Sequence, residues 1–175
     1  MPIVLPYDPE WALRFEVESA MLERVLAPWL EGGVHHIGST AVPGLPAKPI
    51  IDIIAGVREL DEARAASDRL ALLGYAWHAH RPEAHAFFKP ADGSTQTHHL
   101  HLTEPGSDLW RERLAFRDAL LANPALVAEY AAWKARHADG PGSNGGYTGD
   151  KRPLVLRVLA EAGIELKPDS ERLSR

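Results

Sequence analysis

The run from Ile50 to Val57 constrains the fold more than any other part of the chain. Apart from Asp52, its residues are almost wholly apolar. Successive side chains of a strand point to opposite faces of the sheet, so this pattern is typical of a strand buried on both faces. The sequence therefore predicts an α/β (α+β) protein in which helices flank a small mixed sheet.

The segments around this strand read as alternating helices and strands. Helices are expected from Asp8-Pro9 to about Leu30 with Gly32-Gly33 as the terminator, from Leu60 to Leu73, from a Ser107 cap to Leu121, from Asn123-Pro124 to about His137, and from Pro153 to Gly163. Strands are expected at Val34–Ile37, Tyr75–His78, Ala84–Lys89 and Thr97–Leu102, and the turn Pro90-Ala91-Asp92-Gly93 predicts a hairpin between the last two. The glycine-rich run Asp139–Gly149 is expected to form a flexible loop that could act as a lid.

Length and composition favour one cytoplasmic domain. A chain of 175 residues fits a single domain over 1–168, followed by a polar tail over 169–175. It has no cysteine, which excludes disulfides, thiolate zinc sites and a cysteine nucleophile. The apolar runs are too short for us to expect a membrane span, and the first residues lack the basic region and cleavage site of a signal peptide. The net charge of −5 argues against nucleic acid as a partner, because phosphate-backbone binding usually needs a basic face.

The turn Gly38-Ser39-Thr40 is the first candidate site. A glycine lets the backbone approach a ligand closely, and backbone N–H groups with two hydroxyls can surround phosphate oxygens. The spacing to Lys48 differs from that of a Walker A loop. A tight turn capped by its own hydroxyls is the purely structural alternative.

Asp52 and Lys48 add charge beside this turn. A carboxylate within an apolar strand is costly to bury unless it is hydrogen-bonded, paired or bound to metal. Asp52 could therefore face a ligand held by the turn, or could simply be tied to nearby backbone N–H groups. Lys48 could pair with a phosphate or with Asp52, and a solvated surface lysine is the alternative.

Histidines form the second candidate cluster. On the predicted strand, His99 and His101 share one face while His98 points to the other. Two imidazoles in this arrangement can ligate a metal or exchange a proton with a ligand. Hydrogen-bonded core histidines are the structural alternative.

Bases on the later helices are less specific. Arg111, Arg117 and Lys134 are expected to be solvated, as scattered helical bases usually are. Tyr147 and Lys151 differ because they flank the end of the glycine-rich run, where a closing segment could bring them over a ligand.

Several ordered blocks of the chain resemble the GrpB family, which also occurs fused to dephospho-CoA kinase. The blocks are Tyr7-Asp8-Pro9-x-Trp11, His36-Ile37-Gly38-Ser39-Thr40-x-Val42-Pro43-Gly44-Leu45, Ala47-Lys48-Pro49-Ile50-Ile51-Asp52-Ile53, His98-His99-Leu100-His101, Phe116-Arg117-Asp118 and Tyr147-x-x-x-Lys151. The resemblance covers the chain from about Tyr7 to Gly163 and implies a nucleotidyltransferase-like fold of the polymerase β superfamily. In that superfamily a Gly-Ser turn holds triphosphate and strand carboxylates bind divalent metal.

Carried onto this chain, the resemblance matches Gly38 and Ser39 to the turn and Asp52 to the first carboxylate. The second carboxylate position holds Ile54, and the strand expected to carry the third acid holds histidines instead. An Asp with two imidazoles suits Zn²⁺, Mn²⁺ or Fe²⁺ better than Mg²⁺. A missing acid could also come from Glu83 or Asp92 on the hairpin.

The resulting hypothesis is a nucleotide or small phosphate ligand bound at Gly38, Ser39 and Thr40, with Lys48, Tyr147 and Lys151 neutralising or enclosing it. Asp52, His99 and His101 would form the catalytic or metal-binding corner, with Mg, Mn or Zn as the candidate metal. Three functions stay open. The chain could be an enzyme using Asp52 and His101 as a base or as ligands, a nucleotidyltransferase that takes its missing acid from elsewhere, or a non-catalytic nucleotide-binding or regulatory module.

Overall fold

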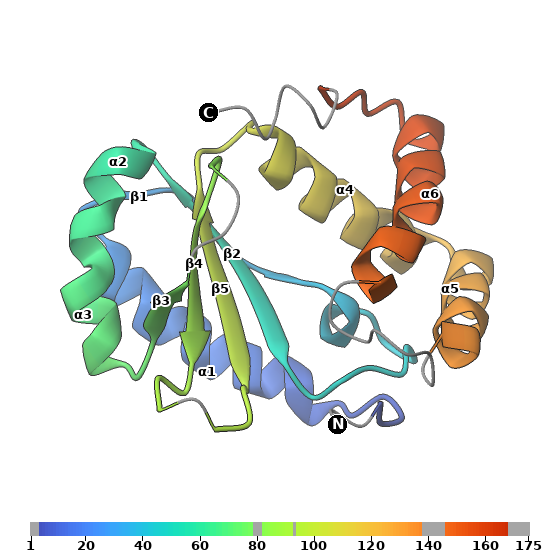
Figure 1. The fold of residues 1–175 in the computed structure, drawn as a ribbon, viewed down its shortest axis with the longest axis horizontal. Helices are drawn as coiled ribbons and strands as arrows, with labels where there is room; N and C mark the ends of the chain where they lie inside the picture. The colour runs from blue at the N-terminus through green and yellow to red at the C-terminus, as the bar shows by residue number, and fades with distance from the viewer. Residues whose placement is uncertain (1–3, 79–81, 93, 138–145, 168–175) are drawn as a thin grey trace.

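A five-stranded mixed sheet forms the centre of the structure, a computed structural model that describes residues 4–78, 82–92, 94–137 and 146–167, without the side chains of residues 137 and 146–150. The strands are β1 (Leu30–Ile37), β2 (Ile51–Val57), β3 (Ala76–His78), β4 (His85–Lys89) and β5 (His98–Thr103), in the order β1-β2-β5-β4-β3. β2 and β5 run parallel, and the other neighbours are antiparallel. The predicted small mixed sheet is confirmed, as is the hairpin between β4 and β5 (Figure 1).

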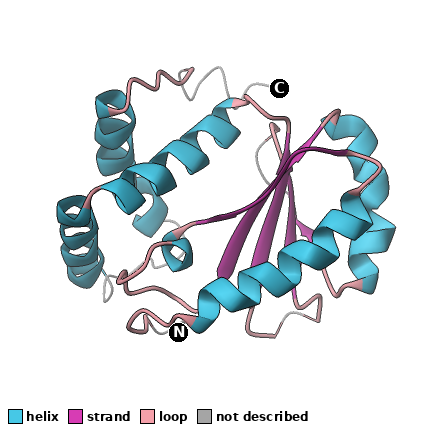
Figure 2. Ribbon diagram, turned by 180° about the vertical axis from the view of Figure 1, so that it is seen from behind, coloured by secondary structure: helices cyan, strands magenta, loops and turns pink. Residues whose placement is uncertain are grey.

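The helices form two groups, one packed on the sheet and one beside it. The helical elements are α1 (Glu10–Leu26), the short 3₁₀ helix η1 (Ser39–Ala41), α2 (Leu60–Ala63), η2 (Arg64–Ala66), α3 (Ser67–Leu72), α4 (Asp108–Ala122), α5 (Pro124–His137) and α6 (Gly146–Glu161). Figure 2 shows α1 running across one face of the sheet, and α4, α5 and α6 gathered together away from it.

Two apolar clusters hold these groups in place. The first lies between the sheet and the helices α1 and α3, and includes Trp11, Leu22, Ile53, Leu70 and Leu100. The second packs the three late helices together and includes Phe116, Tyr130 and Val158, with Val42 and Leu45 from the connection between β1 and β2. The second cluster therefore fixes the late helices against the segment that follows the Gly38 turn.

Strand alternation separates the two faces of the sheet. In β2, Ile51, Ile53 and Ala55 belong to the first cluster, so Asp52 points to the opposite face. In β5, Leu100 and Leu102 belong to that cluster as well. The neighbouring His99 and His101 therefore share the Asp52 face, as predicted.

The first helix and strand differ from expectation. Glu10 donates its N–H to the Asp8 carboxylate, as the predicted cap requires, but α1 ends at Leu26 instead of Leu30. Gly32 and Gly33 do not terminate the helix; they lie inside β1, with φ values of 82° and 84°, where the pairing with β2 shifts register. A glycine pair supplies positive φ for a helix end and for a strand bulge alike, so the local signal is ambiguous.

The later helices also differ from expectation. The expected Leu60–Leu73 helix is broken by η2 into α2 and α3. The last helix begins at Gly146 instead of Pro153, and Pro153 lies inside it. Burial of Val155 and Val158 against the late-helix cluster outweighs the low helix propensity of proline there. Asn123 opens α5 as predicted, because its side-chain oxygen accepts the N–H groups of residues 125 and 126.

The predicted polar tail and most of the predicted lid fall outside the described residues. Within the part of the chain that is described, no helix combines the length and apolar character needed to cross a membrane.

Candidate functional site

The Gly38 turn and Asp52 are in direct contact. β1 ends at Ile37, and Gly38 then takes φ 72° and ψ −169°, a conformation reserved almost entirely for glycine. A Cβ at Gly38 would collide with the Asp52 carboxylate. The chain therefore passes close under Asp52 before entering η1 at Ser39.

Asp52 pairs with His99 across two parallel strands. The register places the two residues opposite each other, and Nδ1 of His99 lies 3.1 Å from Oδ1 of Asp52. The second ring nitrogen, Nε2, lies 2.8 Å from the Gln96 side-chain oxygen. The Phe88 ring packs on the imidazole at 4.2 Å between centroids. The carboxylate, the amide and the ring together fix the orientation of His99.

The environment favours an ionised Asp52. Burial opposes the charge, but the hydrogen bond from His99 and the positive charges of His99, His101 and Arg113 outweigh it, so the pKa of Asp52 is lowered. A third of the side chain stays exposed, at 33%. Asp52 is thus an accessible carboxylate held by positive neighbours.

The divalent-metal site that the sequence suggested stays a prediction. Within the described parts of the chain, no group of at least three His, Cys, Asp or Glu side chains has the arrangement to hold a metal ion. Both nitrogens of His99 already contact side-chain oxygens, so ligation by His99 would require Gln96 to move away. Ile54, at the expected position of the second carboxylate, is fully buried.

The two alternative sources of a missing acid, Glu83 and Asp92, make other contacts. The carbonyl of Glu83 accepts the Thr103 hydroxyl at the end of β5, opposite the end that carries His99. Asp92 is exposed on the hairpin turn, where it accepts the N–H of Ser94.

Lys134 joins α5 to the Gly38 turn. Its ammonium group donates to the Ser39 hydroxyl, and to the Pro46 carbonyl at 2.8 Å. Only 5% of Lys134 is exposed, so the expectation of a solvated helical lysine is wrong. Packing of α5 against the β1–β2 connection turns this side chain inward.

The ammonium groups of two lysines lie close to the Tyr130 ring. The ammonium group of Lys134 lies 4.8 Å from the ring centroid, and that of Lys151 lies 4.9 Å away. Lys151 also lies 4.7 Å from the Phe116 ring. Cation–π attraction partly replaces the water that both ammonium groups lose.

Arg113 on α4 completes the group, hereafter the cationic cluster: Arg113, Lys134 and Lys151. Burial first, and then the charge of Arg113, lower the pKa of Lys151 to about 8. Burial first, and then the charge of Lys151, lower the pKa of Lys134 to about 7. Asp52 acts in the opposite direction on both lysines, so its carboxylate faces the cluster.

Thr40 and His36 anchor the turn from behind. The Thr40 hydroxyl donates to the Ile50 carbonyl at 3.1 Å, and Nε2 of His36 lies 3.0 Å from the same hydroxyl. Burial lowers the pKa of His36 to about 4, with opposing effects from Asp52 and Arg117. His36 is therefore neutral at pH 7 and donates to Thr40.

The structure brings together most of the residues that the sequence singled out. Gly38, Ser39, Asp52, His99 and Lys151 lie around one site. Lys151 belongs to α6 and not to a loop. Lys48 is half-buried just before β2, and the Tyr147 side chain lies outside the described set.

Sequence reasoning missed Arg113, Tyr130 and Lys134. Tyr130 and Lys134 are four residues apart on one helix, a spacing that places them on the same face. That signal was available, but it does not say which way the face turns.

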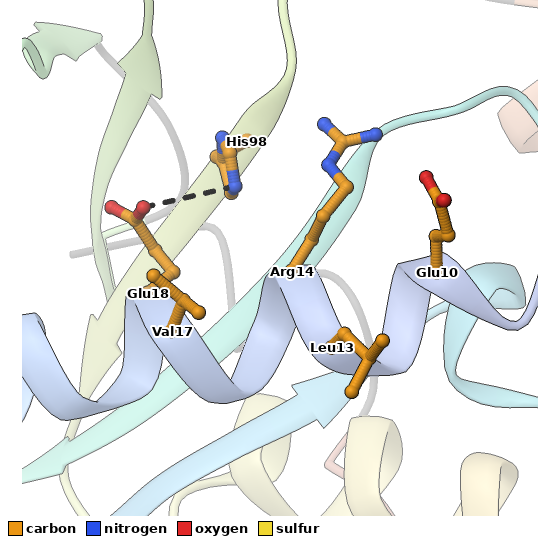
Figure 3. A pocket seen from close by; sticks show the side chains of 6 residues that line it. All are labelled: Glu10, Leu13, Arg14, Val17, Glu18 and His98. Atoms are coloured by element: carbon orange, nitrogen blue, oxygen red, sulfur yellow. Dashed lines mark ion pairs between the residues drawn. The ribbon is translucent and has the colours of Figure 1, made fainter.

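A hollow lies on the face of the sheet opposite Asp52, between α1 and β5 (Figure 3). It is lined by Glu10, Leu13, Arg14, Val17, Glu18 and His98. His98 points here, away from His99, and its Nε2 lies 3.8 Å from a Glu18 oxygen. The sheet separates this hollow from Asp52.

Comparison with known proteins identifies the family. The model of the family described as "GrpB protein" matches residues 2–161. The chain belongs to the GrpB family. It is 35% identical over 166 residues to the glutamate-rich protein GrpB of Alkalihalophilus pseudofirmus, covering 91% of this chain and 94% of that protein. The crystal structure of GrpB from Enterococcus faecalis is similar with a TM-score of 0.78 at 29% identity, over 91% of this chain and 96% of that one.

A more distant likeness concerns the fold alone. Cid1, a protein with RNA terminal uridylyl transferase activity, is similar with a TM-score of 0.51 at 11% identity, over 74% of this chain and 39% of Cid1. The nucleotidyltransferase-like fold expected from the sequence is thereby confirmed for this GrpB-family chain.

Proposed function

We propose that this GrpB-family protein binds a nucleotide or another phosphate-bearing ligand between the Gly38-Ser39 turn and the late helices. Arg113 and Lys151 would face the phosphates, while Lys134 holds the Ser39 hydroxyl in place. Asp52 and His99 would lie on the opposite side of the ligand. Thr40 is assigned to holding the turn, because its hydroxyl already contacts Ile50 and His36.

The observation that carries this proposal is the convergence of the cationic cluster on the turn. Burial, and then the charge of a neighbouring cation, depress the pKa values of both lysines, and such a group is stabilised by an incoming anion. Among the described residues, the buried Nε of Arg113 has no hydrogen-bond partner. A buried donor without a partner is uncommon, and a small shift of the side chain would let it donate to a phosphate oxygen.

Phosphate recognition here would rest on side chains more than on backbone. Two-metal phosphoryl transfer needs several oxygen ligands, which the described residues do not supply. Charge neutralisation would instead come from Arg113 and Lys151. The proposal places the protein in the cytoplasm, the compartment of nucleoside triphosphates, with a small ligand as its partner in preference to a nucleic acid.

Two outcomes are compatible with such binding. The first is nucleotidyl or phosphoryl transfer, in which His99, oriented by Asp52, would accept a proton from the attacking group after Gln96 moves away from Nε2. The second is a non-catalytic binding or regulatory module, which the buried Ile54 at the second carboxylate position favours. Chromatographic analysis of nucleotides after incubation separates them, because only transfer or hydrolysis consumes the triphosphate.

The first experiment is a melting-temperature screen with the four nucleoside triphosphates. Ligand at about 100 times its Kd should stabilise the protein by about 2.7 kcal/mol, which gives a measurable shift. Arg113→Met and Lys151→Met should each abolish most of the shift. The matched controls Arg58→Met and Lys167→Met remove exposed cations and should keep it. Equal shifts in all four variants would exclude the cationic cluster as the binding site.

A further inference from the structure

Ser39 has the surroundings of an activated nucleophile. Its side chain is half-buried and directly follows Gly38, at the first position of η1. Its hydroxyl contacts the ammonium nitrogen of Lys134. Phosphate binding alone does not require a hydroxyl that is already engaged with a buried amine.

The position of Lys134 suits a base better than a surface cation. The side chain is 5% exposed and packs on the Tyr130 ring, so the charged form loses most of its hydration. One N–H bond is directed at the Pro46 carbonyl, 2.8 Å away. In the neutral amine, this bond leaves the nitrogen lone pair free to accept the Ser39 proton. The lowering of the Lys134 pKa to about 7, mainly through burial, makes the neutral amine accessible near neutral pH.

We propose that Ser39 and Lys134 form a nucleophile–base pair. Ser39 attacks and receives a phosphoryl or nucleotidyl group, and Lys134 accepts the Ser39 proton. In the step with a nucleoside triphosphate, the Ser39 oxygen attacks the α-phosphorus and forms a new P–O bond. The bond from this phosphorus to the bridging oxygen breaks, and pyrophosphate leaves with the electron pair. The Ser39 proton passes to Nζ of Lys134. The product is a phosphodiester between Ser39 and the nucleoside.

The rest of the site fits such a step. Lys151 and Arg113 lie where they would offset negative charge on the phosphates, and such charge stabilisation is a large term in phosphoryl transfer. The identity of the natural electrophile rests on the proposed nucleotide binding. The nucleophilicity of Ser39 does not, because it depends on contacts within the protein, with Lys134 and with the Tyr130 hydroxyl.

An uncharged phosphofluoridate tests the pair without requiring nucleotide recognition. Diisopropyl fluorophosphate reacts by forming an O–P bond and releasing fluoride, and peptide mass spectrometry locates the adduct. We expect labelling at Ser39, with a rate that rises from pH 6 to pH 8 as Lys134 loses its proton. Lys134→Met should slow labelling roughly 100-fold, within the usual contribution of a general base. Lys134→Arg keeps the charge but supplies no base and should be equally slow.

Ser39→Ala should remove the adduct, and Ser94→Ala, at an exposed turn, should leave it unchanged. The wild-type pH profile keeps the test decisive even where a Lys134 variant fails to fold, which circular dichroism would reveal. Labelling of Ser39 no faster than that of Ser94, or a rate independent of pH, would overturn the proposal.

The same samples separate the two proposals. Incubation with nucleoside triphosphates should give a covalent nucleotidyl adduct on Ser39, visible in the intact mass and missing in Ser39→Ala. Nucleotide binding in the melting screen without phosphofluoridate labelling would overturn the nucleophile and leave the proposed binding intact. Labelling without nucleotide binding would support the nucleophile and remove the proposed ligand.

Discussion

The carboxylate of Asp52 occupies the space into which a side chain at Gly38 would project. β2 carries Asp52, the one polar side chain of the Ile50–Val57 run. This side chain therefore packs directly against the backbone of the turn at Gly38. This contact sets the distance between Asp52 and Ser39, and hence the geometry of the whole site.

Gly38→Ala should destabilise the protein by roughly 2–4 kcal/mol, because backbone strain at this φ/ψ costs about 1–3 kcal/mol and the collision with Asp52 adds to it. Urea unfolding of Gly38→Ala and Gly106→Ala would separate the two terms. Gly106 also has positive φ, at 85°, but among the described residues no atom lies within 4 Å of the point that a Cβ there would occupy. Equal losses in both variants would show that Asp52 does not restrict position 38.

Lys134 should make stability rise with pH. Its pKa is about 7 in the folded protein and 10.5 in the reference state, so between these values the unfolded chain binds more protons. The free energy of unfolding then increases with pH, by at most about 1.4 kcal/mol per pH unit for one group. Lys134→Met should lose the part of this increase that Lys134 contributes between pH 7 and 10 and keep the part from Lys151, while the exposed-site control Lys167→Met keeps both. Parallel curves for wild type and Lys134→Met would contradict a depressed lysine pKa.

The ion pair with Lys89 should stabilise the buried carboxylate of Glu18. The Lys89 ammonium donates to both Glu18 oxygens at 3.0 Å, and the Tyr75 hydroxyl donates at 3.0 Å. Lys89→Met leaves a carboxylate that is 3% exposed without its ion pair, which should cost about 3–5 kcal/mol. The double variant Glu18→Gln/Lys89→Met should recover part of that loss in chemical denaturation. No recovery would mean that Lys89 acts through packing and not through charge.

Nucleotide affinity should survive the removal of divalent metal. Arg113 and Lys151 supply the positive charge in the proposed complex, and the described residues form no metal site. Titration of a nucleoside triphosphate in EDTA should therefore give a Kd within about tenfold of that measured with Mg²⁺, a difference of up to about 1.4 kcal/mol. Binding that disappears in EDTA would assign phosphate recognition to a bound metal instead.

The sequence predicted those parts of the structure that depend on local pattern. The apolar run identified β2, and strand alternation placed His99 and His101 on one face. Ser107 caps α4 as expected, accepting the N–H of Trp110. Each of these inferences needs only the residues within one element.

The parts that could not be predicted depend on how distant elements pack. Lys134 and Arg113 look like ordinary helical cations until α4 and α5 are placed over the Gly38 turn. The pairing of β2 with β5 sets His99 beside Asp52. In the sequence these two strands are separated by α2, η2, α3, β3 and β4. Burial and charge convergence arise only from that long-range arrangement.

Isothermal titration of a nucleoside triphosphate at pH 8, in buffers of different ionisation enthalpy, tests the central claim most directly. Lys151, with a pKa of about 8, is close to half protonated at that pH, and a bound polyanion raises its pKa. Binding should therefore take up about half a proton through Lys151, and Lys134, with a pKa of about 7, can add to this uptake. Lys151→Met should bind more weakly and take up less, whereas Lys167→Met should behave as wild type. An absence of binding, or proton uptake in Lys151→Met as large as in wild type, would contradict phosphate recognition by the cationic cluster.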